Sequence, residues 1–241
     1  MEIIPVHIEK EIEPSDDISE LISQNTALND GDVIVIAQKI ISKQEGRSVN
    51  LSDVSPSLLA EGIASQYHKD SRLVELILSE SKRIVRMKNE IIIVQTNSGF
   101  ICANAGVDES NVKDGYATLL PINSDISAQH IRQKIKENTN KNVAVIVSDT
   151  FGRPFRMGQT NCAIGISGLN PILDYAGTVD SFGKVLRVTE IAIADEFSAA
   201  AELVMGKTLK CPVVVIRDYT FDVEEIGVHK LIRNDKEDLF R

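Results

Sequence analysis

The sequence predicts a protein of the α/β or α+β class, and three observations lead to that class. Apolar runs rich in β-branched residues, typical of buried strands, alternate along the chain with amphipathic segments typical of helices. The 241 residues suit one large domain or two small ones, with a sizeable core. No repeat, low-complexity segment or sharp change of composition marks a linker. We therefore expect any second domain to be interwoven with the first.

The expected strands are short apolar runs, most of them rich in valine and isoleucine, as buried strands are. The clearest is the run of residues 32–40 (DVIVIAQKI), which a polar turn at residues 42–46 follows. In chain order the expected strands are residues 2–8, 32–40, 90–106 as a hairpin that turns at residues 97–99, 142–148, 160–168 and 211–218.

The expected helices begin at capping signals or show an amphipathic pattern. Asp16 and Asp17 open the first, and Ser55 and Pro56 supply a cap and a first-turn proline for the second. In chain order the expected helices are residues 16–24, a helical stretch from 55 to 83, 127–139 and the alanine-rich segment 190–205.

Composition excludes several classes of partner. The net charge of −9 makes nucleic acid an unfavourable partner, although a local basic pocket for a small anion is compatible with it. No apolar run approaches the ~20 residues needed to span a bilayer, and the acidic N-terminus does not resemble a signal peptide. Three widely spaced cysteines without a CxxC pair suggest neither a disulfide framework nor a zinc site. We expect a cytoplasmic protein with no nucleic-acid or membrane partner.

Two acidic segments follow apolar runs. Asp108 lies in residues 104–111 (NAGVDESN), and Asp149 begins the polar part of residues 148–156 (SDTFGRPFR). Carboxylates at strand ends are well placed to meet a ligand at the edge of a sheet. Magnesium takes one or two carboxylates together with water and phosphate oxygens. Asp108 and Asp149 fit this need, with the Thr150 hydroxyl as a further oxygen ligand. The structural alternative for either segment alone is a capped, salt-bridged loop.

Basic residues accompany these acids. Arg153 and Arg156 can each hold a phosphate or carboxylate through two hydrogen bonds, and Pro154 restrains the segment between them. The alternative is that both arginines neutralise Asp149 and its neighbours. No catalytic nucleophile stands out, so these arginines are the candidate catalytic groups. Lys39 and Lys43, at the expected end of the second strand, are candidate phosphate contacts, or else two solvated lysines.

The tripeptide Gly206-Lys207-Thr208 looks like the end of a phosphate-binding P-loop, but the pattern is incomplete. The loop needs a glycine where Ala201 stands, and it should open a helix, whereas this tripeptide closes one. Gly206 is more naturally a helix C-cap, and Lys207 remains able to contact a phosphate.

Taken together, five segments resemble the family of coenzyme F420 L-glutamate ligases, the γ-glutamyl ligases of a deazaflavin coenzyme. The match of SDTFGRPFR followed by GQTN is highly specific, and the segments follow the family's order over most of the chain. The segments are residues 30–47, 104–112, 148–169, 180–196 and 200–207.

The resemblance implies a fold and an activity. The fold is an α+β arrangement of the family's own, with mixed sheets, in a single γ-glutamyl ligase domain over residues 1–241 made of two interwoven subdomains, and it forms a homodimer. Some relatives carry a C-terminal flavin-binding domain, for which this chain leaves no room. The activity is GTP-dependent ligation of L-glutamate to the lactyl carboxylate of the glutamate-free coenzyme, F420-0, through an acyl phosphate. Further glutamates can follow through γ-linkages.

The resemblance also implies roles for individual residues. Asp108 and Asp149 hold one divalent ion, Mg²⁺ or Mn²⁺, and Thr150 helps to hold a second; K⁺ is a further candidate ion. Residues 9–12 match another nucleotide-contacting turn by position only. The expected nucleotide contacts are Gln38, Lys39, Lys43, Asn111, Met205, Gly206, Lys207 and Thr208.

Two departures from the family pattern accompany the match. Lys207 stands where some members carry an acidic metal ligand, and Asp218 stands where many have glycine. Two rival functions remain at this point: a metal-dependent nucleotide hydrolase or phosphatase, and a non-catalytic nucleotide-binding protein.

Overall fold

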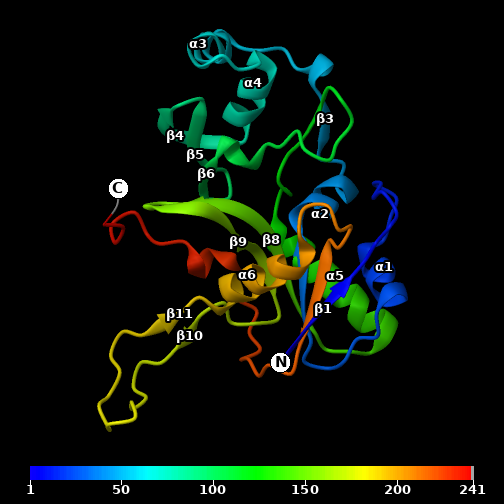
Figure 1. Ribbon diagram of the computed structural model, residues 1–241, viewed down its shortest axis with the longest axis vertical. Helices are drawn as coiled ribbons and strands as arrows, with labels where there is room; N and C mark the ends of the chain where they lie inside the picture. Colours follow the sequence, from blue (N-terminus) through cyan, green and yellow to red (C-terminus); the bar gives the residue numbers. More distant parts are fainter. Residues whose placement is uncertain (240–241) are drawn as a thin grey trace.

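The computed structural model describes residues 1–239 and is built around a mixed five-stranded sheet (Figure 1). β2 and β8 are parallel, whereas the other neighbouring pairs are antiparallel. Across the sheet the strands are β1 (Glu2–Val6), β12 (Val213–Arg217), β2 (Val33–Ala37), β8 (Ala144–Arg153) and β9 (Arg156–Ser167). The chain is therefore an α+β protein whose central sheet is mixed, whereas its smaller sheets are antiparallel.

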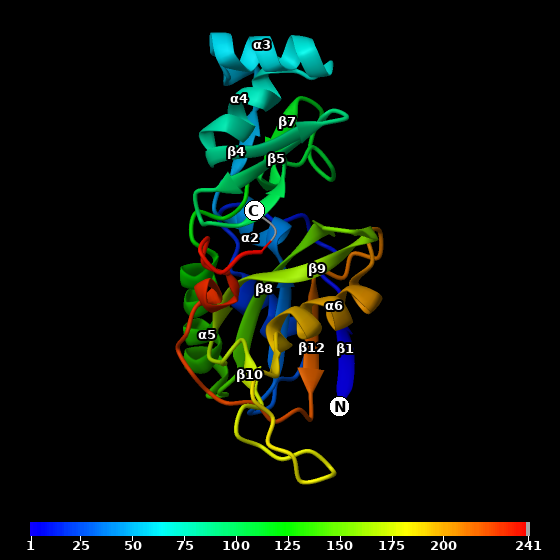
Figure 2. The same ribbon diagram turned by 90° about the vertical axis from the view of Figure 1, so that its left-hand side faces the viewer.

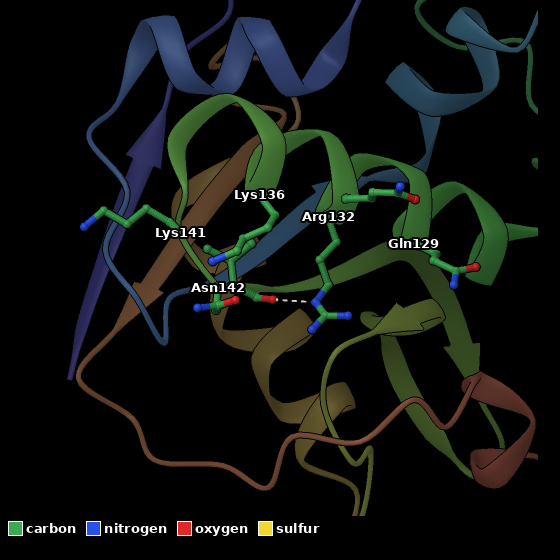
Figure 3. A pocket seen from close by; sticks show the side chains of 7 residues that line it. Gln129, Arg132, Lys136, Lys141 and Asn142 are labelled. Atoms are coloured by element: carbon green, nitrogen blue, oxygen red, sulfur yellow. Dashed lines mark hydrogen bonds between the residues drawn. The ribbon is translucent and has the colours of Figure 1, made fainter.

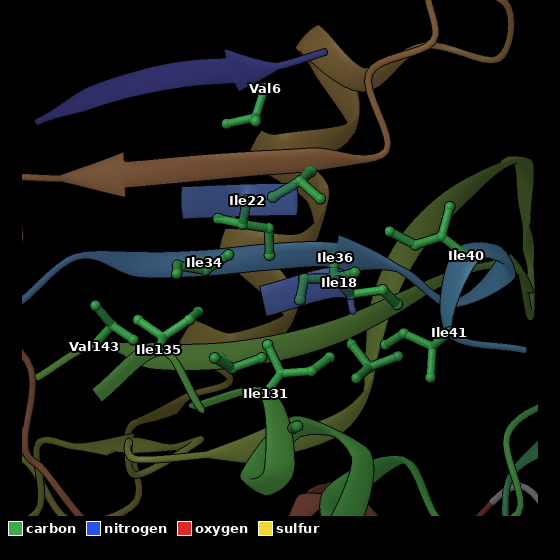
Figure 4. Packing of buried hydrophobic residues seen from close by; sticks show 14 of the residues in the cluster. Val6, Ile18, Ile22, Ile34, Ile36, Ile40, Ile41, Ile131, Ile135 and Val143 are labelled. Carbon is green, nitrogen blue, oxygen red and sulfur yellow. The ribbon is translucent and has the colours of Figure 1, made fainter. Parts of the chain in front are cut away.

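Helices cover both faces of this sheet, because successive side chains of a strand point to opposite faces. Ile34 and Ile36 of β2 contact the helices on one face (Figure 4), and Val33 and Val35 contact the helix on the other. The helices are α1 (Ile18–Asn25) and α5 (Ser124–Thr139) on the first face, and α6 (Ile193–Met205) on the second. Burial on both faces explains why the sequence of β2 is a continuous apolar run.

Residues 48–118 form a distal lobe at one end of the molecule (Figure 2). The chain enters and leaves the lobe through two paired strands, so the lobe is inserted between α2 and α5. Its elements are β3 (Ser48–Asn50), η1 (Leu51–Asp53), α3 (Leu58–Tyr67), α4 (Ser71–Ser79), β4 (Ser81–Lys88), β5 (Ile91–Thr96), β6 (Ile101–Ala103), η2 (Asn104–Gly106) and β7 (Tyr116–Thr118). Its separate apolar core includes Ile63, Val74, Ile77, Ile92 and Val94.

An arm of residues 173–191 extends from the opposite end of the molecule (Figure 1). The two-residue strands β10 (Leu173–Asp174) and β11 (Glu190–Ile191) pair at its base. A bridge between Val179 and Val185 continues the pairing towards the tip. The C-terminal region adds the short helix η3 (Val228–Leu231).

The structure corrects the expected end of the second strand. β2 ends at Ala37, and residues 38–44 form the helix α2 (Gln38–Gln44), so Lys39 and Lys43 lie on a helix and not at a strand exit. Ile40 and Ile41 are buried in the core, which continues the apolar run of β2 into the helix. A short apolar run has no period that distinguishes the two conformations.

Two further expectations were wrong in detail. The helical stretch from 55 to 83 is two helices, α3 and α4, separated by His68 in the left-handed region (φ 51°), and the residues after Ser79 form β4. Because of two register shifts in β4, its partly buried residues recur at every third position and not at every second one. This spacing resembles that of a helix. Residues 148–153 are not a loop, because β8 continues to Arg153 and pairs with β9 in a hairpin.

The remaining expected elements are present with shifted ends. The hairpin turn at residues 97–99 lies between β5 and β6, and α5 begins at Ser124 after the cap residue Asn123. Within residues 1–239, no helix is both long and apolar enough to cross a bilayer.

Candidate functional site

The two acids expected to share a metal ion come from different parts of the fold and lie close enough for the charge of Asp108 to act on Asp149. Asp149 lies on β8, two positions beyond the fully buried Val147, and pairs in register with Cys162 of β9. Asp108 lies at the base of the distal lobe, where its backbone exchanges two hydrogen bonds with Thr118 (3.0 and 2.8 Å). Phe151 of β8 packs edge-on against Phe100 of the lobe, with ring centroids 6.1 Å apart. The acids therefore meet where the lobe joins the sheet.

Lys39 of α2 closes this group of charges. Its Nζ donates to Asp108 Oδ2 (2.5 Å) and to the Oγ and backbone oxygen of Ser110 (2.8 and 2.9 Å). The backbone N–H and the hydroxyl of Ser110 donate to the same carboxylate (2.8 and 2.7 Å). Burial raises the pKa of Asp108, but the hydrogen bonds from Lys39 and Ser110 outweigh burial and hold that pKa below its usual value.

Asp149 has the opposite environment. Burial raises its pKa to about 6, and the nearby negative charge of Asp108 acts in the same direction. The backbone N–H of Thr150 and the charges of Lys39 and Lys207 oppose this rise without cancelling it. A carboxylate that is destabilised by burial and by a second carboxylate is stabilised by a bound cation. The pair Asp108 and Asp149 therefore fits one hard divalent ion.

Thr150 lies next to Asp149 on β8 and has two polar partners. Its hydroxyl donates to Asn161 Oδ1 of β9 (2.6 Å) and accepts from Lys207 Nζ (2.7 Å). Lys207 follows α6, and its Nζ also lies 3.3 Å from Glu202 Oε1. Four segments that are distant in sequence thus bring together two ammonium groups and two carboxylates, namely α2, the base of the distal lobe, β8 and the end of α6.

Lys43, one of the expected nucleotide contacts, belongs to a second group of charges. Lys43 of α2 forms an ion pair with Glu11, and Lys210 forms one with Glu9 (2.9 Å). The backbone N–H of Ile8 donates to Lys210 O (3.1 Å). Residues 8–11, α2 and the loop after α6 therefore lie side by side, as a shared nucleotide site requires.

Comparison with known proteins decides the family. The profile of the family described as F420-0:Gamma-glutamyl ligase matches residues 8–218. Proteins named "Coenzyme F420:L-glutamate ligase" are 47% identical in Methanothermobacter thermautotrophicus (93% of this chain, 90% of the relative) and 41% identical in Methanopyrus kandleri (100% and 98%). The one from Archaeoglobus fulgidus is 38% identical (100% and 96%).

This chain belongs to the F420-0:gamma-glutamyl ligase family. It is therefore an amide-forming ligase. Some of the expected nucleotide residues are less accessible than the sequence suggests. Gln38 is buried, with its Oε1 accepting from Ser42 Oγ (2.8 Å), and the Met205 side chain lies in the apolar core. Asn111 is exposed, with a left-handed backbone (φ 55°).

The arginines of the ligase do not neutralise Asp149. Both are exposed near the tip of the β8–β9 hairpin, and Arg153 Nη2 donates to Met157 O (3.0 Å). The Arg156 side chain has no ion-pair or hydrogen-bond partner within residues 1–239, although its backbone pairs with Arg153 in the hairpin. Arg153 lies four residues beyond Asp149, about 13 Å along an extended strand. The arginines are thus free to meet a substrate, at some distance from the carboxylate pair.

Sequence reasoning missed two residues of the site. Ser110 connects Asp108 to Lys39, and Asn161 receives the hydroxyl proton of Thr150. Asn161 lies within the segment GQTN, and the β8–β9 register places it opposite Thr150. If residues 148–153 are recognised as a strand, the register of the hairpin identifies Asn161 as the residue opposite Thr150.

A surface pocket of about 270 Å³ lies at the other end of the sheet (Figure 3). Arg132 Nε donates to Val143 O there (2.8 Å), just before the start of β8 and six residues before Asp149. The pocket is lined by Gln129, Arg132, Gln133, Lys136, Lys141, Asn142 and Val143. Basic residues stabilise the C-terminal end of a helix such as α5, which explains this cluster structurally.

Proposed function

We propose that this ligase joins L-glutamate to the lactyl carboxylate of F420-0 at the expense of GTP, through an acyl phosphate. The observation that carries the proposal is the convergence of Asp108, Asp149, Lys39 and Lys207 beside residues 8–11. The relatives named "Coenzyme F420:L-glutamate ligase" support the choice of substrates. Phosphoryl transfer depends on positioning and on neutralisation of charge, which such a group supplies without a covalent nucleophile.

In the first step an oxygen of the lactyl carboxylate attacks the γ-phosphorus of GTP. The bond from that phosphorus to the bridging oxygen breaks, and GDP leaves with the electron pair. In the second step the free amine of glutamate attacks the acyl carbon, an amide bond forms, and phosphate departs while the nitrogen loses a proton to solvent. Further glutamates would be added by repeating both steps on the newest γ-carboxylate.

The residues of the chain act mainly through charge. Lys39 and Lys43 would contact phosphate oxygens, each leaving the acid with which it now pairs. The ammonium of Lys207 would approach the same phosphates from the end of α6. Arg153 and Arg156, exposed on the hairpin, would bind the acceptor through its phosphodiester or carboxylate. Asn111 would contact the nucleotide.

A divalent ion, Mg²⁺ or Mn²⁺, fits at Asp108 and Asp149, which would hold it through their carboxylate oxygens. When bound, such an ion neutralises charge on the phosphate oxygens during transfer. The second ion expected beside Thr150 does not fit in the same way, because the Lys207 ammonium already contacts that hydroxyl. Activation by K⁺ stays a prediction.

The ligase is proposed to act as a cytoplasmic homodimer. Exposed apolar side chains on the arm support pairing with a second copy, since Phe182 is 89% and Val188 is 88% exposed in the single chain. The three cysteines are free thiols, which agrees with a reducing compartment.

Mass spectrometry of the products tests the proposed function. The ligase is incubated with F420-0, L-glutamate and GTP, and the expected product is F420-0 enlarged by one or more glutamate residues, together with GDP. Parallel reactions with ATP in place of GTP show which nucleotide the ligase uses. Reactions that omit F420-0 or L-glutamate show which of the two substrates GTP consumption requires. If GTP is hydrolysed at an equal rate without acceptors and no adduct forms, the protein is a hydrolase and the proposal is wrong.

A further inference from the structure

Lys207 reaches the site because of the way α6 ends. Gly206 caps the helix with φ 55° and ψ −170°, and its N–H donates to Glu202 O (3.2 Å). This left-handed turn favours glycine. A side chain at Gly206 would also come within 3.1 Å of Leu209. After this turn, Lys207 contacts Thr150 on β8.

The Thr150 hydroxyl faces Lys207 as it would face a metal ion. An amide oxygen can only accept, so the hydroxyl proton must point to Asn161 Oδ1, 2.6 Å away. The lone pairs of Thr150 Oγ1 are thereby turned towards Lys207 Nζ, 2.7 Å away. The ammonium stands where a cation bound by this hydroxyl would stand, and its contact with Glu202 Oε1 (3.3 Å) supplies a carboxylate partner.

The positive charge of Lys207 also acts on Asp149, one of the two carboxylates. It lowers the pKa of Asp149 and so opposes the effect of burial. A divalent ion next to this ammonium would experience strong repulsion at short range. The Thr150 hydroxyl and the Glu202 carboxylate, the oxygens that the structure places beside this ammonium, already have Lys207 as their cationic partner.

We propose that the Lys207 ammonium takes the place of a second divalent ion, so that this ligase works with one divalent ion at Asp108 and Asp149. This inference rests on the proposed function, because the role of Lys207 is to contact the transferred phosphate together with that single ion. The alternative is that Lys207 only balances Glu202 and the negative end of the α6 dipole.

Counting bound Mn²⁺ tests the proposal directly. Wild-type protein saturated with a non-hydrolysable GTP analogue is titrated with Mn²⁺, and bound ions are counted by electron paramagnetic resonance. We expect one ion per chain in the wild type and in Lys207→Met. The control is Lys141→Glu, which changes the charge by the same amount as Lys207→Glu but lies at the far end of the sheet. This control protein should also bind one Mn²⁺ ion. Lys207→Glu, which adds a carboxylate next to Thr150, should bind two. Two ions in the wild type, or one in Lys207→Glu, would overturn the proposal.

Kinetics separate a phosphate contact from a structural role. Lys207→Met should lower kcat/KM for GTP by roughly a hundredfold, the scale expected for one key electrostatic group, with an unchanged melting temperature. Glu202→Gln, which removes the carboxylate partner, should lower it much less. Equal losses in the two variants would show that the ion pair alone matters and would refute the inference. The ion count does not depend on turnover, so it decides this inference even if no glutamylated product forms and the proposed function fails.

Discussion

Replacement of Asp149 by asparagine should make the metal-free ligase more stable while abolishing most of its activity. In the folded chain, burial and the charge of Asp108 raise the pKa of Asp149 from 3.8 to about 6. A shift of about two units corresponds to ~3 kcal/mol of free energy that the folded state loses when this carboxyl ionises. Asparagine keeps the shape without the charge, so the variant avoids that loss.

The sign of the pH dependence follows from the direction of the shift. Because the pKa of the folded state is raised, the penalty is absent below about pH 4, grows between pH 4 and 6, and is complete at pH 7. In a chain of this length, ~3 kcal/mol corresponds to roughly 6–12 °C in Tm. Asp149→Asn should therefore melt several degrees above the wild type at pH 7 in EDTA, and the difference should shrink as the pH falls towards 4.

Calorimetry or circular dichroism measures this difference, with the exposed Asp114→Asn as a matched control expected to leave Tm unaltered. Saturating Mn²⁺ should reverse the order, because only the wild type then gains binding energy. Activity at limiting metal should fall a hundredfold or more in Asp149→Asn, on the order of 3 kcal/mol of transition-state stabilisation. An Asn variant no more stable than the wild type at pH 7, or one that turns over normally, would refute this account of Asp149.

Three further outcomes are expected from the same structure. Arg153→Lys and Arg156→Lys should raise the KM for GTP or for the acceptor. Their Tm should stay within about 1 °C of the wild type, since both side chains are exposed. A large fall in Tm with an unaltered KM would instead assign the arginines a structural role. Phosphate release from GTP, followed with a coupled dye, should be slow alone and rise when F420-0 and glutamate are both present, and equal rates would indicate a hydrolase. Phe182→Asp, at the tip of the arm, should shift the mass measured by light scattering at micromolar concentration from that of a dimer to that of a monomer. Leu58→Asp, at an equally exposed position on the distal lobe, should leave the mass unchanged. A monomeric wild type would exclude the proposed dimer.

Much of the fold could be predicted because its signals are local. The continuous apolar run of β2, the Asp17 cap of α1 and the Gly206 cap of α6 each reflect contacts within a few residues of chain. The prediction failed where tertiary context overrides a local pattern. Ile40 and Ile41 extend the core into a helix, and the register shifts of β4 hide its strand period. The polar end of β8 looked like a loop because a hairpin that projects from the core needs no apolar side chains.

The sequence by itself determined which chemical groups are present, and its motifs identified the acids, lysines and arginines of the site. Only the tertiary structure decided which of them meet. Lys39 contacts Asp108 across 69 residues of chain, and Lys207 contacts Thr150 across 57. Such contacts depend on strand order and on the docking of the distal lobe, which no local pattern encodes. The arginines beside Asp149 in sequence lie apart from it in space, because an extended strand moves the chain about 3.3 Å per residue. The Lys207 ammonium, distant in sequence, arrives instead, because α6 packs against β9 and ends beside Thr150.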